Sequence, residues 1–359
     1  MKHVPSIQGA LFATLLAAPR ALAQTSSAEA VPPFQGGSPA TTQANRFGLS
    51  YRMGFNVPVS FKNLGGFAPL SANGANYNYD NGYVFDNGYG LVDDSIRRVT
   101  TYYGYAEGSR VSDHAVVMQK SWSEATANSN NHYDSPMSGV ELTYNREFFR
   151  KQGWRAGLEG AFGYTFMAVR DVGRESADVT RVSDTYEAPQ FGGIRGFLPD
   201  APFFGPQRGV PSLVASPSST MTEILPGGAW IAGQRDFNAD MFSFRFGPYV
   251  EIPLSQSIVV TLSGGFALMY VSSEFSFNDT VAIAGVGSVP QVASGWGNAW
   301  LPGGYIAGNF MLALNKSWSL VAGAQFENLG TYTQKLNGKE ATLDLSRSVF
   351  VSLGLSYSF

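Results

Sequence analysis

Residues 46–62 read RFGLSYRMGFNVPVSFK and decide the fold. From Phe47 to Phe61 the apolar side chains fall on odd-numbered positions, while small, polar or charged residues fill most even-numbered positions, with Pro58 near the end. Side chains along a β-strand alternate between its two faces. The stretch therefore predicts a long strand with one continuous apolar face and one small or polar face.

The same alternation recurs along the rest of the chain. Strong examples lie at 139–148, 154–166, 242–252, 258–270, 306–314, 318–327 and 343–359, and weaker ones at 100–106 and 114–122. Together with residues 46–62 they predict about ten strands. Segments 179–187 and 220–231 are interpreted as a hairpin within a long extracellular loop, and counting them as spanning strands gives the alternative of twelve.

The connections between these segments alternate in length. Short connections lie at 108–112, 150–153, 253–257 and 315–317, and long ones at roughly 63–99, 123–137, 171–236 and 278–297. Outer-membrane barrels have short periplasmic turns and long extracellular loops. The spacing therefore predicts an all-β, antiparallel, up-and-down transmembrane barrel with both termini on the periplasmic side.

The composition leaves two classes of protein open. Only 14% of the 359 residues are charged, against about 25% in a typical soluble domain. No stretch approaches the roughly 20 consecutive apolar residues that a membrane-spanning helix needs. A large soluble all-β protein and a β-barrel in lipid both fit. The absence of cysteine excludes disulfides and cysteine-based zinc or thiol chemistry.

Strand length and aromatic placement favour the barrel in lipid. Soluble strands average about 5–6 residues, whereas a tilted membrane strand needs about 9–11, and the runs in this sequence are of the longer kind. Tyrosine and tryptophan prefer the membrane–water boundary. Aromatic residues towards the ends of apolar runs are Trp154, Tyr270, Trp300, Trp318, Phe326 and Tyr357. Because lipid offers no partner to a free sheet edge, we expect the strand from Arg46 to pair with the strand that ends at Phe359.

The N-terminus predicts export. Lys2 precedes a short apolar run at 10–18, and Ala21 and Ala23 are small residues at the positions that a signal peptidase reads, so we expect cleavage after Ala23. Residues 1–23 are then the signal peptide, 24–45 a flexible periplasmic lead-in and 46–359 the barrel. Removing Lys2 and Arg20 changes the formal charge from −3 to −5. That charge is too mild and mixed to predict a nucleic-acid partner.

The C-terminal sequence SLGLSYSF resembles the β-signal of bacterial outer-membrane β-barrel proteins. The fixed positions of that signal are a polar residue, a glycine and two aromatic residues, the second of them terminal. The matching residues are Ser352, Gly354, Tyr357 and Phe359. The resemblance implies recognition by the barrel-assembly machinery, a place in the cell outer membrane and contact with outer-membrane lipid.

Charged residues on the small or polar face predict what lines the lumen. The candidates are Arg52, Glu141, Glu159, Arg245, Glu327 and Arg347. A barrel of about eight strands is filled by its own side chains, whereas open pores usually take about 16. At ten strands we expect a filled or very narrow interior. The leading interpretation is a structural or surface-interaction barrel whose extracellular loops contact the environment, and the alternative is a narrow, porin-like channel for small solutes.

Histidines raise a third interpretation, a barrel hydrolase. His114 follows Asp113, and His132 lies two residues before Asp134. Omptin-type proteases use Asp and His, and lipid A deacylases and phospholipases use Ser and His, so such pairs are candidates for activating water or a serine. No further motif of these families accompanies them. We expect no catalytic site, no cofactor and no metal site.

Two short repeats, YDNGY at 79–83 and FDNGY at 85–89, occupy the first long connection. Asn-Gly favours tight hairpin turns, so a turn-rich surface loop is the expected structure. A calcium or carbohydrate contact is the functional alternative, because carboxylate and amide oxygens suit calcium and tyrosine rings stack on sugars.

Overall fold

The computed structural model describes residues 44–69, 76–86, 88–92, 95–129, 136–151, 153–191, 193–205 and 212–359. These residues form strands, turns and irregular segments. No helix among them is long and apolar enough to cross a membrane. The signal peptide, its cleavage after Ala23 and all but the last two residues of the lead-in lie outside the described residues.

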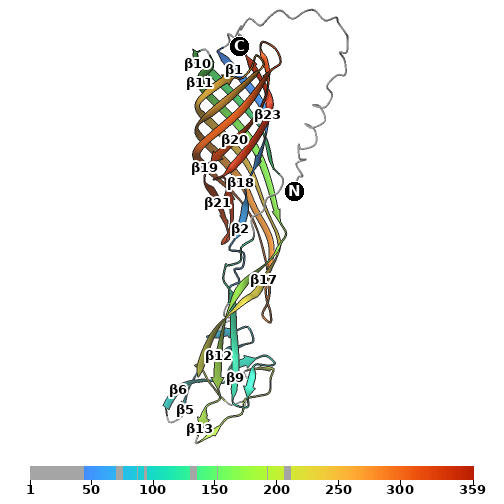
Figure 1. Ribbon diagram of the computed structural model, residues 1–359. Coiled ribbons are helices and arrows are strands. Elements are labelled where there is room, and N and C mark those ends of the chain that lie inside the picture. The colour runs from blue at the N-terminus through green and yellow to red at the C-terminus, as the bar shows by residue number, and fades with distance from the viewer. Residues whose placement is uncertain are drawn as a thin grey trace, which may run out of the picture. The chain divides into compact units, whose positions relative to one another are not determined.

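Eight long strands pair in a ring, in which each strand has two antiparallel neighbours (Figure 1). The order is β11-β10-β1-β23-β20-β19-β18-β17, and the pairing of β17 with β11 returns it to its start. The strands of this ring are β1 (Asn45–Phe55), β10 (Met137–Lys151), β11 (Trp154–Asp171), β17 (Ser219–Pro253), β18 (Ile258–Ile283), β19 (Gly287–Ala313), β20 (Trp318–Asn328) and β23 (Ser348–Ser358).

The expected pairing of the first strand with the last is confirmed. Arg46 lies opposite Ser358, and the register runs to Phe55 opposite Val349. The amide of Ser358 donates to the carbonyl of Ser317, 2.8 Å away, in the turn between β19 and β20. The start of β1 and the end of β23 therefore lie at the same end of the ring as the short turns.

The ring has eight strands, where the sequence predicts about ten. Segments 100–106 and 114–122 contribute β7 (Tyr103–Tyr105) and β9 (Ala115–Ser123), which pair outside the ring. All three residues of β7 are buried, so it has no exposed apolar side like that of the ring strands. The short connection at 108–112 is consequently part of this outer region and does not lie with the short turns of the ring.

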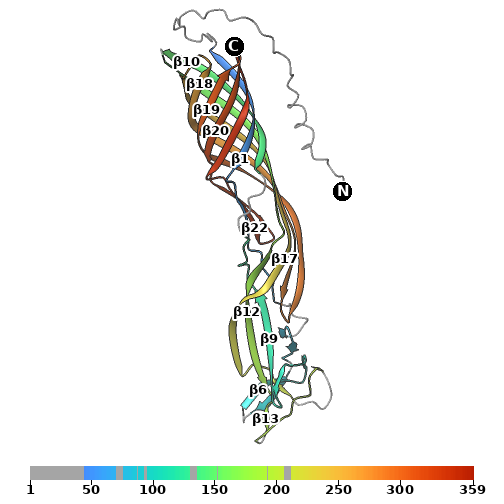
Figure 2. The same cartoon turned by 45° about the vertical axis from the view of Figure 1, so that its right-hand side comes forward.

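Strands of the ring continue beyond it as an extension. In this extension β12 (Arg174–Glu187) pairs with Ser219–Leu225 and Ala229–Ala232 of β17, and β9 pairs with the other edge of β12 (Figures 1 and 2). The expected pairing of 179–187 with 220–231 is confirmed, but 220–231 is not part of a separate loop hairpin, because it belongs to β17, which continues into the ring. The long loop expected at 278–297 is wrong, because β18 and β19 run on to Ile283 and Gly287 as a hairpin.

Short strands complete the outer part of the extension. They form the sheets β15-β7-β4-β3, β16-β6-β5 and β13-β14, and β8 pairs with β9. Their bounds are β3 (Tyr77–Tyr79), β4 (Gly82–Val84), β5 (Gly88–Val92), β6 (Ser95–Thr100), β8 (Arg110–Ser112), β13 (Gln190–Phe191), β14 (Ile194–Arg195), β15 (Phe203–Phe204) and β16 (Leu213–Val214). A second apolar core holds this part together. Its most buried members are Val84, Tyr103, Tyr105, Val116, Met118, Tyr186 and Leu213.

The predicted strand at 46–62 is broken in two. Asn56 has a positive φ of 58°, and Pro58 lacks a backbone donor, so β1 ends at Phe55 and β2 (Val59–Lys62) starts anew. β2 pairs with β22 (Lys339–Asp344), which forms a hairpin with β21 (Thr331–Leu336). This three-stranded sheet packs its apolar side chains into the main core of the molecule, with Val59, Phe61, Ala341 and Leu343 fully buried.

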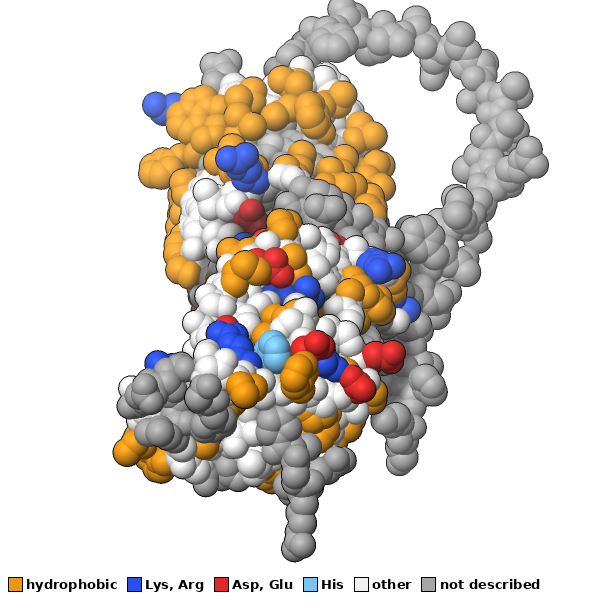
Figure 3. Space-filling model, turned by 90° about the horizontal axis from the view of Figure 1, so that it is seen from below, with side chains coloured by type: hydrophobic (Ala, Val, Ile, Leu, Met, Phe, Trp, Pro, Cys, Tyr) orange, Lys and Arg blue, Asp and Glu red, His pale blue; other side chains and the backbone are white. Residues whose placement is uncertain are grey.

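The two faces of the ring have opposite character. Large apolar side chains are exposed on its outer face, such as Phe246 at 58% and Leu353 at 57%. The space-filling view shows such side chains crowded together in one zone and mixed with charged and polar side chains in another (Figure 3). The ring therefore has an apolar outside, whereas charged side chains such as Arg52 and Arg245 are buried inside it.

Candidate functional site

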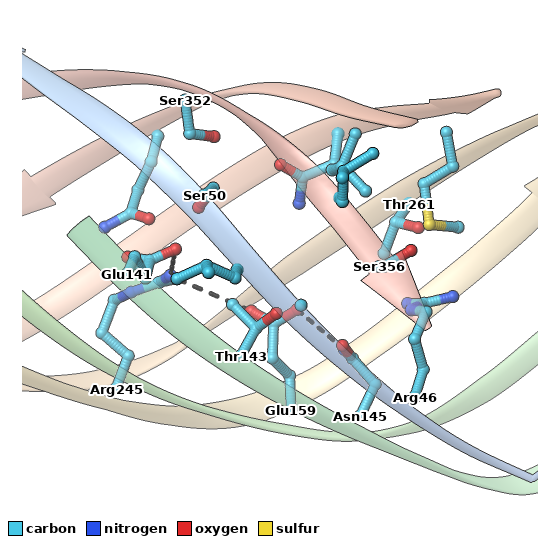
Figure 4. Close-up of a pocket in the computed structure, with 17 residues that line it drawn as sticks. Arg46, Ser50, Glu141, Thr143, Asn145, Glu159, Arg245, Thr261, Ser352 and Ser356 are labelled. Carbon is cyan, nitrogen blue, oxygen red and sulfur yellow. Dashed lines mark hydrogen bonds and ion pairs between the residues drawn. The ribbon is translucent and has the colours of Figure 1, made fainter. Parts of the chain in front are cut away.

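The interior of the ring brings together five of the six predicted lumen residues. Arg52 comes from β1, Glu141 from β10, Glu159 from β11, Arg245 from β17 and Glu327 from β20, and all five are buried. Each sits on the inward parity of its strand. Figure 4 shows Glu141, Glu159 and Arg245 converging from neighbouring strands.

Two guanidinium groups bridge three carboxylates in this central charge cluster. Arg52 Nη1 lies 3.0 Å from Glu141 Oε2, and its Nη2 lies 3.2 Å from Glu327 Oε1. Arg245 Nη2 lies 2.7 Å from Glu141 Oε1, and its Nη1 lies 3.6 Å from Glu159 Oε1. Arg245 Nε also lies 4.0 Å from Glu327 Oε1. The charges are shared across the ring and leave no arginine or glutamate of this cluster without an oppositely charged partner in the buried interior.

Neutral groups complete the cluster. Asn145 donates to Glu159 at 2.9 Å, Ser263 donates to the other oxygen of Glu159 at 3.2 Å, and Gln325 donates to Glu327. A cavity of about 40 Å³ lies among these side chains, which is enough to hold water. The interior at this level is a filled polar core.

A second charged group lies nearer the short turns. Glu251 forms ion pairs with Arg46 and, at 3.5 Å, with Arg155. Arg155 also lies 4.0 Å from Glu147, which Arg150 contacts at 2.5 Å. Together with the exposed Arg150, these residues end the polar interior on the side of the turns.

An apolar layer closes the interior on the side of the extension. Along β17 the inward residues run from Arg245 through Ser243 to Met241, Ala239 and Phe237, the last three almost completely buried. The facing residues on other strands are also buried and apolar: Met137, Met167, Val169, Met269, Val271, Phe275 and Phe350. Arg52 lies 3.7 Å from the centre of the Phe350 ring, where the charge cluster meets this layer.

A third charged group, which the sequence does not predict, lies beyond the apolar layer. Arg235 contacts Asp171 at 2.7 Å and Asp279 at 3.1 Å, and Lys339 of β22 contacts Asp279 at 2.6 Å. All four side chains are nearly inaccessible. Burial lowers the pKa of Lys339, and Asp279 opposes that shift. Asp171, Arg235 and Asp279 fall in predicted loops, although inward alternation continues through them.

Arg347 does not join the lumen residues. It is exposed in the turn before β23, and its backbone carbonyl accepts a hydrogen bond from Asn56 Nδ2 at 2.7 Å. The expectation is wrong because the predicted strand 343–359 is interrupted at this turn, so parity counted across it does not report the facing of Arg347.

The β-signal residues all belong to the last strand or its end. Ser352 and Gly354 face inward, and Tyr357 faces outward. Phe359 stacks on Phe47 of β1 with ring centres 5.7 Å apart. A Cβ atom on Gly354 would lie 2.2 Å from the carbonyl oxygen of Leu49, so glycine fits this position of β23 beside β1 without a shift of the backbone.

His114 lies in the extension without the geometry of an Asp–His pair. Its Nδ1 lies 2.9 Å from the carbonyl oxygen of Gly196, while Asp113 is exposed and contacts Arg110 at 2.6 Å. His132 and Asp134 lie outside the described residues. Within the described ranges, no group of three or more histidine and carboxylate side chains is placed to hold a metal ion.

The first Asn-Gly repeat forms the expected hairpin turn. Tyr79 lies opposite Gly82, so Asp80 and Asn81 are the two turn residues between β3 and β4. Asn81 accepts from the amide of Gln119 at 2.7 Å and thereby fastens the turn to β9. Asn87 of the second repeat lies outside the described residues.

Similarity to known proteins was found among solved structures only. No family model matches the chain, and no curated protein matches it. The structure is similar to Ail, the attachment invasion locus protein of Yersinia pestis, at 12% identity and a TM-score of 0.29, over 88% of this chain and 99% of that one. It is also similar to the outer membrane protease OmpT of Escherichia coli, at 8% identity and a TM-score of 0.29, over 89% and 98% of the two chains.

A third similar structure is the outer membrane protein OprG of Pseudomonas aeruginosa. The identity is 9% and the TM-score 0.28, over 88% of this chain and 97% of that one. All three are outer-membrane β-barrel proteins. These TM-scores are below 0.5, so it is the strand pairings of the chain itself that define its ring and extension.

Proposed function

We propose that this chain is an outer-membrane β-barrel whose occluded ring anchors a surface-exposed β-extension, and that it acts by contact and not by conduction or catalysis. Its partners would be outer-membrane lipid, the barrel-assembly machinery during insertion, and a ligand of the extension. The observation that carries the proposal is a change in the outward side chains of β17. Along the strand they switch from apolar to polar between two successive outward positions.

The outward residues of β17 show that change. From Ile252 to Phe242 they are all apolar, Pro248 included. The next outward residues are Asp240, Asn238 and Asp236. The apolar part spans 11 residues, which matches the roughly 9–11 that a tilted strand needs to cross the hydrocarbon core. At the boundary Tyr164 donates to Asp240 at 2.5 Å, so its ring lies on the apolar side and its hydroxyl points to the polar side.

Aromatic pairs mark both ends of this band. At the end with the short turns, the rings of Trp318 and Tyr357 are 5.0 Å apart. At the opposite end, the rings of Tyr270 and Trp300 are 4.8 Å apart. Amphipathic rings are enriched at the two interfaces of a membrane. Two aromatic pairs separated by exposed aliphatic and phenylalanine side chains support a membrane position for the ring.

The interior supports anchoring over conduction. An ion that crosses the ring must leave the central charge cluster and pass between Met241, Phe237 and their buried apolar neighbours. Moving a bare charge into such a layer costs several kcal/mol or more. Leu343 of β22 and Leu345, which follows the end of β22, join the same core, both fully buried. The narrow-channel alternative gains no support from this arrangement.

The test combines three measurements on one preparation. We expect the membrane-extracted protein to migrate differently before and after boiling, to show no steady conductance in planar bilayers, and to lose its extension when intact cells are treated with proteinase K. Steady conductance through solute-sized openings would contradict the anchoring role and indicate a channel. Recovery of the protein as a detergent-free soluble monomer with native strand content would contradict the membrane position.

A further inference from the structure

The three strands of the extension present one open sheet face. Directly paired residues of neighbouring strands lie on the same face. Three such rows cross from β9 over β12 to β17. The rows are Trp122–Thr180–Ile224, Lys120–Val182–Thr222 and Met118–Asp184–Thr220. Met118 is buried in the second apolar core, the outer core of the extension. Ile224, Thr222 and Thr220 are exposed, so the face is covered at one end only.

Two hollows lie next to each other on this face and share Trp122. One, of about 410 Å³, is lined by Tyr77, Asn78, Lys120 and Asp184 besides Trp122. The other, of about 570 Å³, adds Phe67, Ser123, Val289 and Gln291. Both volumes are in the range of roughly 300–1,000 Å³ typical of ligand sites. The half-buried indole therefore forms a ridge between two adjoining subsites.

The first hollow combines ring faces with oriented polar groups. Tyr79 donates to Asp184 Oδ2 at 2.6 Å, and Thr220 donates to its Oδ1 at 2.5 Å. These two bonds hold the carboxylate in place, and each of its oxygens keeps a further lone pair for a ligand. Tyr77, 40% exposed, stands at the rim. Aromatic surface beside fixed acceptors and donors suits a ligand with apolar faces and hydroxyl edges.

The charge of the hollow narrows the ligand class. Lys120 and Asp184 carry opposite charges, so the lining of the first hollow has no net charge to attract a polyanion. The floor between them is threonine and valine, and it lacks the large desolvated apolar centre of a protein–protein interface. A chain of neutral sugar rings fits both features, because its C–H faces can stack on Trp122 and Tyr77 while its hydroxyls meet Asp184, Asn78 and Lys120.

We propose that this groove binds a neutral saccharide chain, with one sugar in each hollow and the chain crossing Trp122. This inference rests on the proposed function only in placing the groove outside the cell. The saccharide could be the neutral O-polysaccharide of lipopolysaccharide in the same membrane or a free neutral polysaccharide. Both sources have the chemistry described, and separate arms of the binding test distinguish them.

The binding test uses the full chain in nanodiscs of phosphatidylethanolamine and phosphatidylglycerol, which contain no sugar. Maltohexaose, cellohexaose, laminarihexaose and a heparin hexasaccharide are titrated by calorimetry, with a neutral O-polysaccharide released from lipopolysaccharide as a separate arm. We expect at least one neutral saccharide to bind with little dependence on salt. Binding in the O-polysaccharide arm alone would assign the groove to the protein's own membrane, and binding of a hexaose would assign it to free polysaccharide.

Matched variants locate the binding. Trp122→Ala should weaken binding about tenfold or more, since every 1.4 kcal/mol is a factor of ten. Trp296→Ala removes an indole that is 75% exposed on β19, away from both hollows, and should leave binding unchanged. If Trp122→Ala alters the heat-dependent gel shift, Tyr77→Ala at the exposed rim replaces it, with an expected loss of severalfold.

Three results would overturn the inference. These are binding of neither the hexaoses nor the O-polysaccharide, equal loss for Trp122→Ala and Trp296→Ala, or salt-sensitive binding of the heparin hexasaccharide alone. Capture of an extended peptide that is insensitive to Trp122→Ala would assign the surface to a protein. Because binding is measured in nanodiscs, a negative binding result leaves the cell-surface proteolysis result intact, and the two proposals fail separately.

Discussion

The ring and the extension use the same strands with opposite rules for what is buried. On β17 the side chains of Phe244 and Phe246 point outward and are 42% and 58% exposed, while Arg245 between them is buried. A few residues earlier on the same strand, Phe237 and Met241 point inward and are fully buried, while Asn238 and Asp240 point outward. Alternation is continuous, and the apolar side changes at residues 241 and 242.

The solvent around each part of the strand, and not the strand conformation, decides whether its inward or its outward side chains are apolar. In water the apolar side must turn inward, as it does around the outer core of the extension with Tyr103, Val116 and Met118. In lipid an outward apolar side chain needs no cover, and the inside is free to hold charges provided that they pair. Under the proposed membrane position, the boundary at Asp240 is the level at which lipid gives way to water.

The largest expected effect comes from removing a charge inside the ring. Arg245→Ala should lower the free energy of unfolding by about 3–5 kcal/mol, because it leaves buried glutamates without their shared cation. Arg347→Ala, at an exposed turn, should change it by less than about 0.5 kcal/mol. Urea unfolding in lipid vesicles measures both. Equal effects would mean that the interior is wet and that the two arginines differ little in surroundings.

Arginine placed on the outer face tests the solvent on each side of the boundary. Phe246→Arg should destabilise the protein by about 2–4 kcal/mol if that position faces the middle of the bilayer, and Asn238→Arg by about 0–1 kcal/mol. Both substitutions are made on outward positions of β17, and the same unfolding assay compares them. A near-neutral Phe246→Arg would show that water and not lipid contacts the ring.

Much of the ring could be predicted from its sequence. Alternation located all eight of its strands at least in part, and parity placed Arg52, Glu141, Glu159, Arg245 and Glu327 on one side before any contact was known. The C-terminal strand and its partner followed from the need to leave no free edge in lipid. These features are local, or follow from one global constraint, and periodicity reports them directly.

The extension was harder to predict for a physical reason. Where β17 leaves the apolar band, the apolar residues change from even positions (Phe242, Phe244) to odd positions (Phe237, Met241). A search for constant parity takes that change for the end of a strand, although the backbone continues. The same change of parity on β18 explains why the sequence analysis places Asp279 in a loop and not on a strand. Arg347 shows the converse error, because its parity was carried across a turn.

A smaller effect is expected at the seam where β1 meets β23. Gly354→Ala should destabilise the ring by about 1–3 kcal/mol, since its Cβ would lie 2.2 Å from the carbonyl oxygen of Leu49 and force the strands apart. Gly308→Ala is the matched control on β19, where a Cβ would lie at an ordinary 3.6 Å from Leu262. The folded fraction on unboiled gels and the unfolding midpoint report both. Equal behaviour of the two variants would contradict close contact at the seam.

The smallest effect separates the two regions by pH. Burial raises the pKa of Tyr105 to about 12 and raises the pKa of Tyr79, Tyr103 and Tyr186 as well. An unfolded tyrosine loses its proton near pH 10. The neutral phenols therefore stabilise the outer core fully below pH 10, and that contribution is lost as the pH rises through 12.

Near-ultraviolet circular dichroism and tyrosinate absorbance should consequently change above pH 10 while the far-ultraviolet strand signal of the ring persists. Tyr105→Phe removes one of the titrating groups and should reduce the absorbance change, at the loss of its 2.5 Å hydrogen bond to the carbonyl of Pro199. The ring holds its structure through paired backbone groups in lipid, which no phenol titration breaks. A strand signal that falls together with the aromatic signal would show that ring and extension unfold as one unit, against a change of solvent at Asp240.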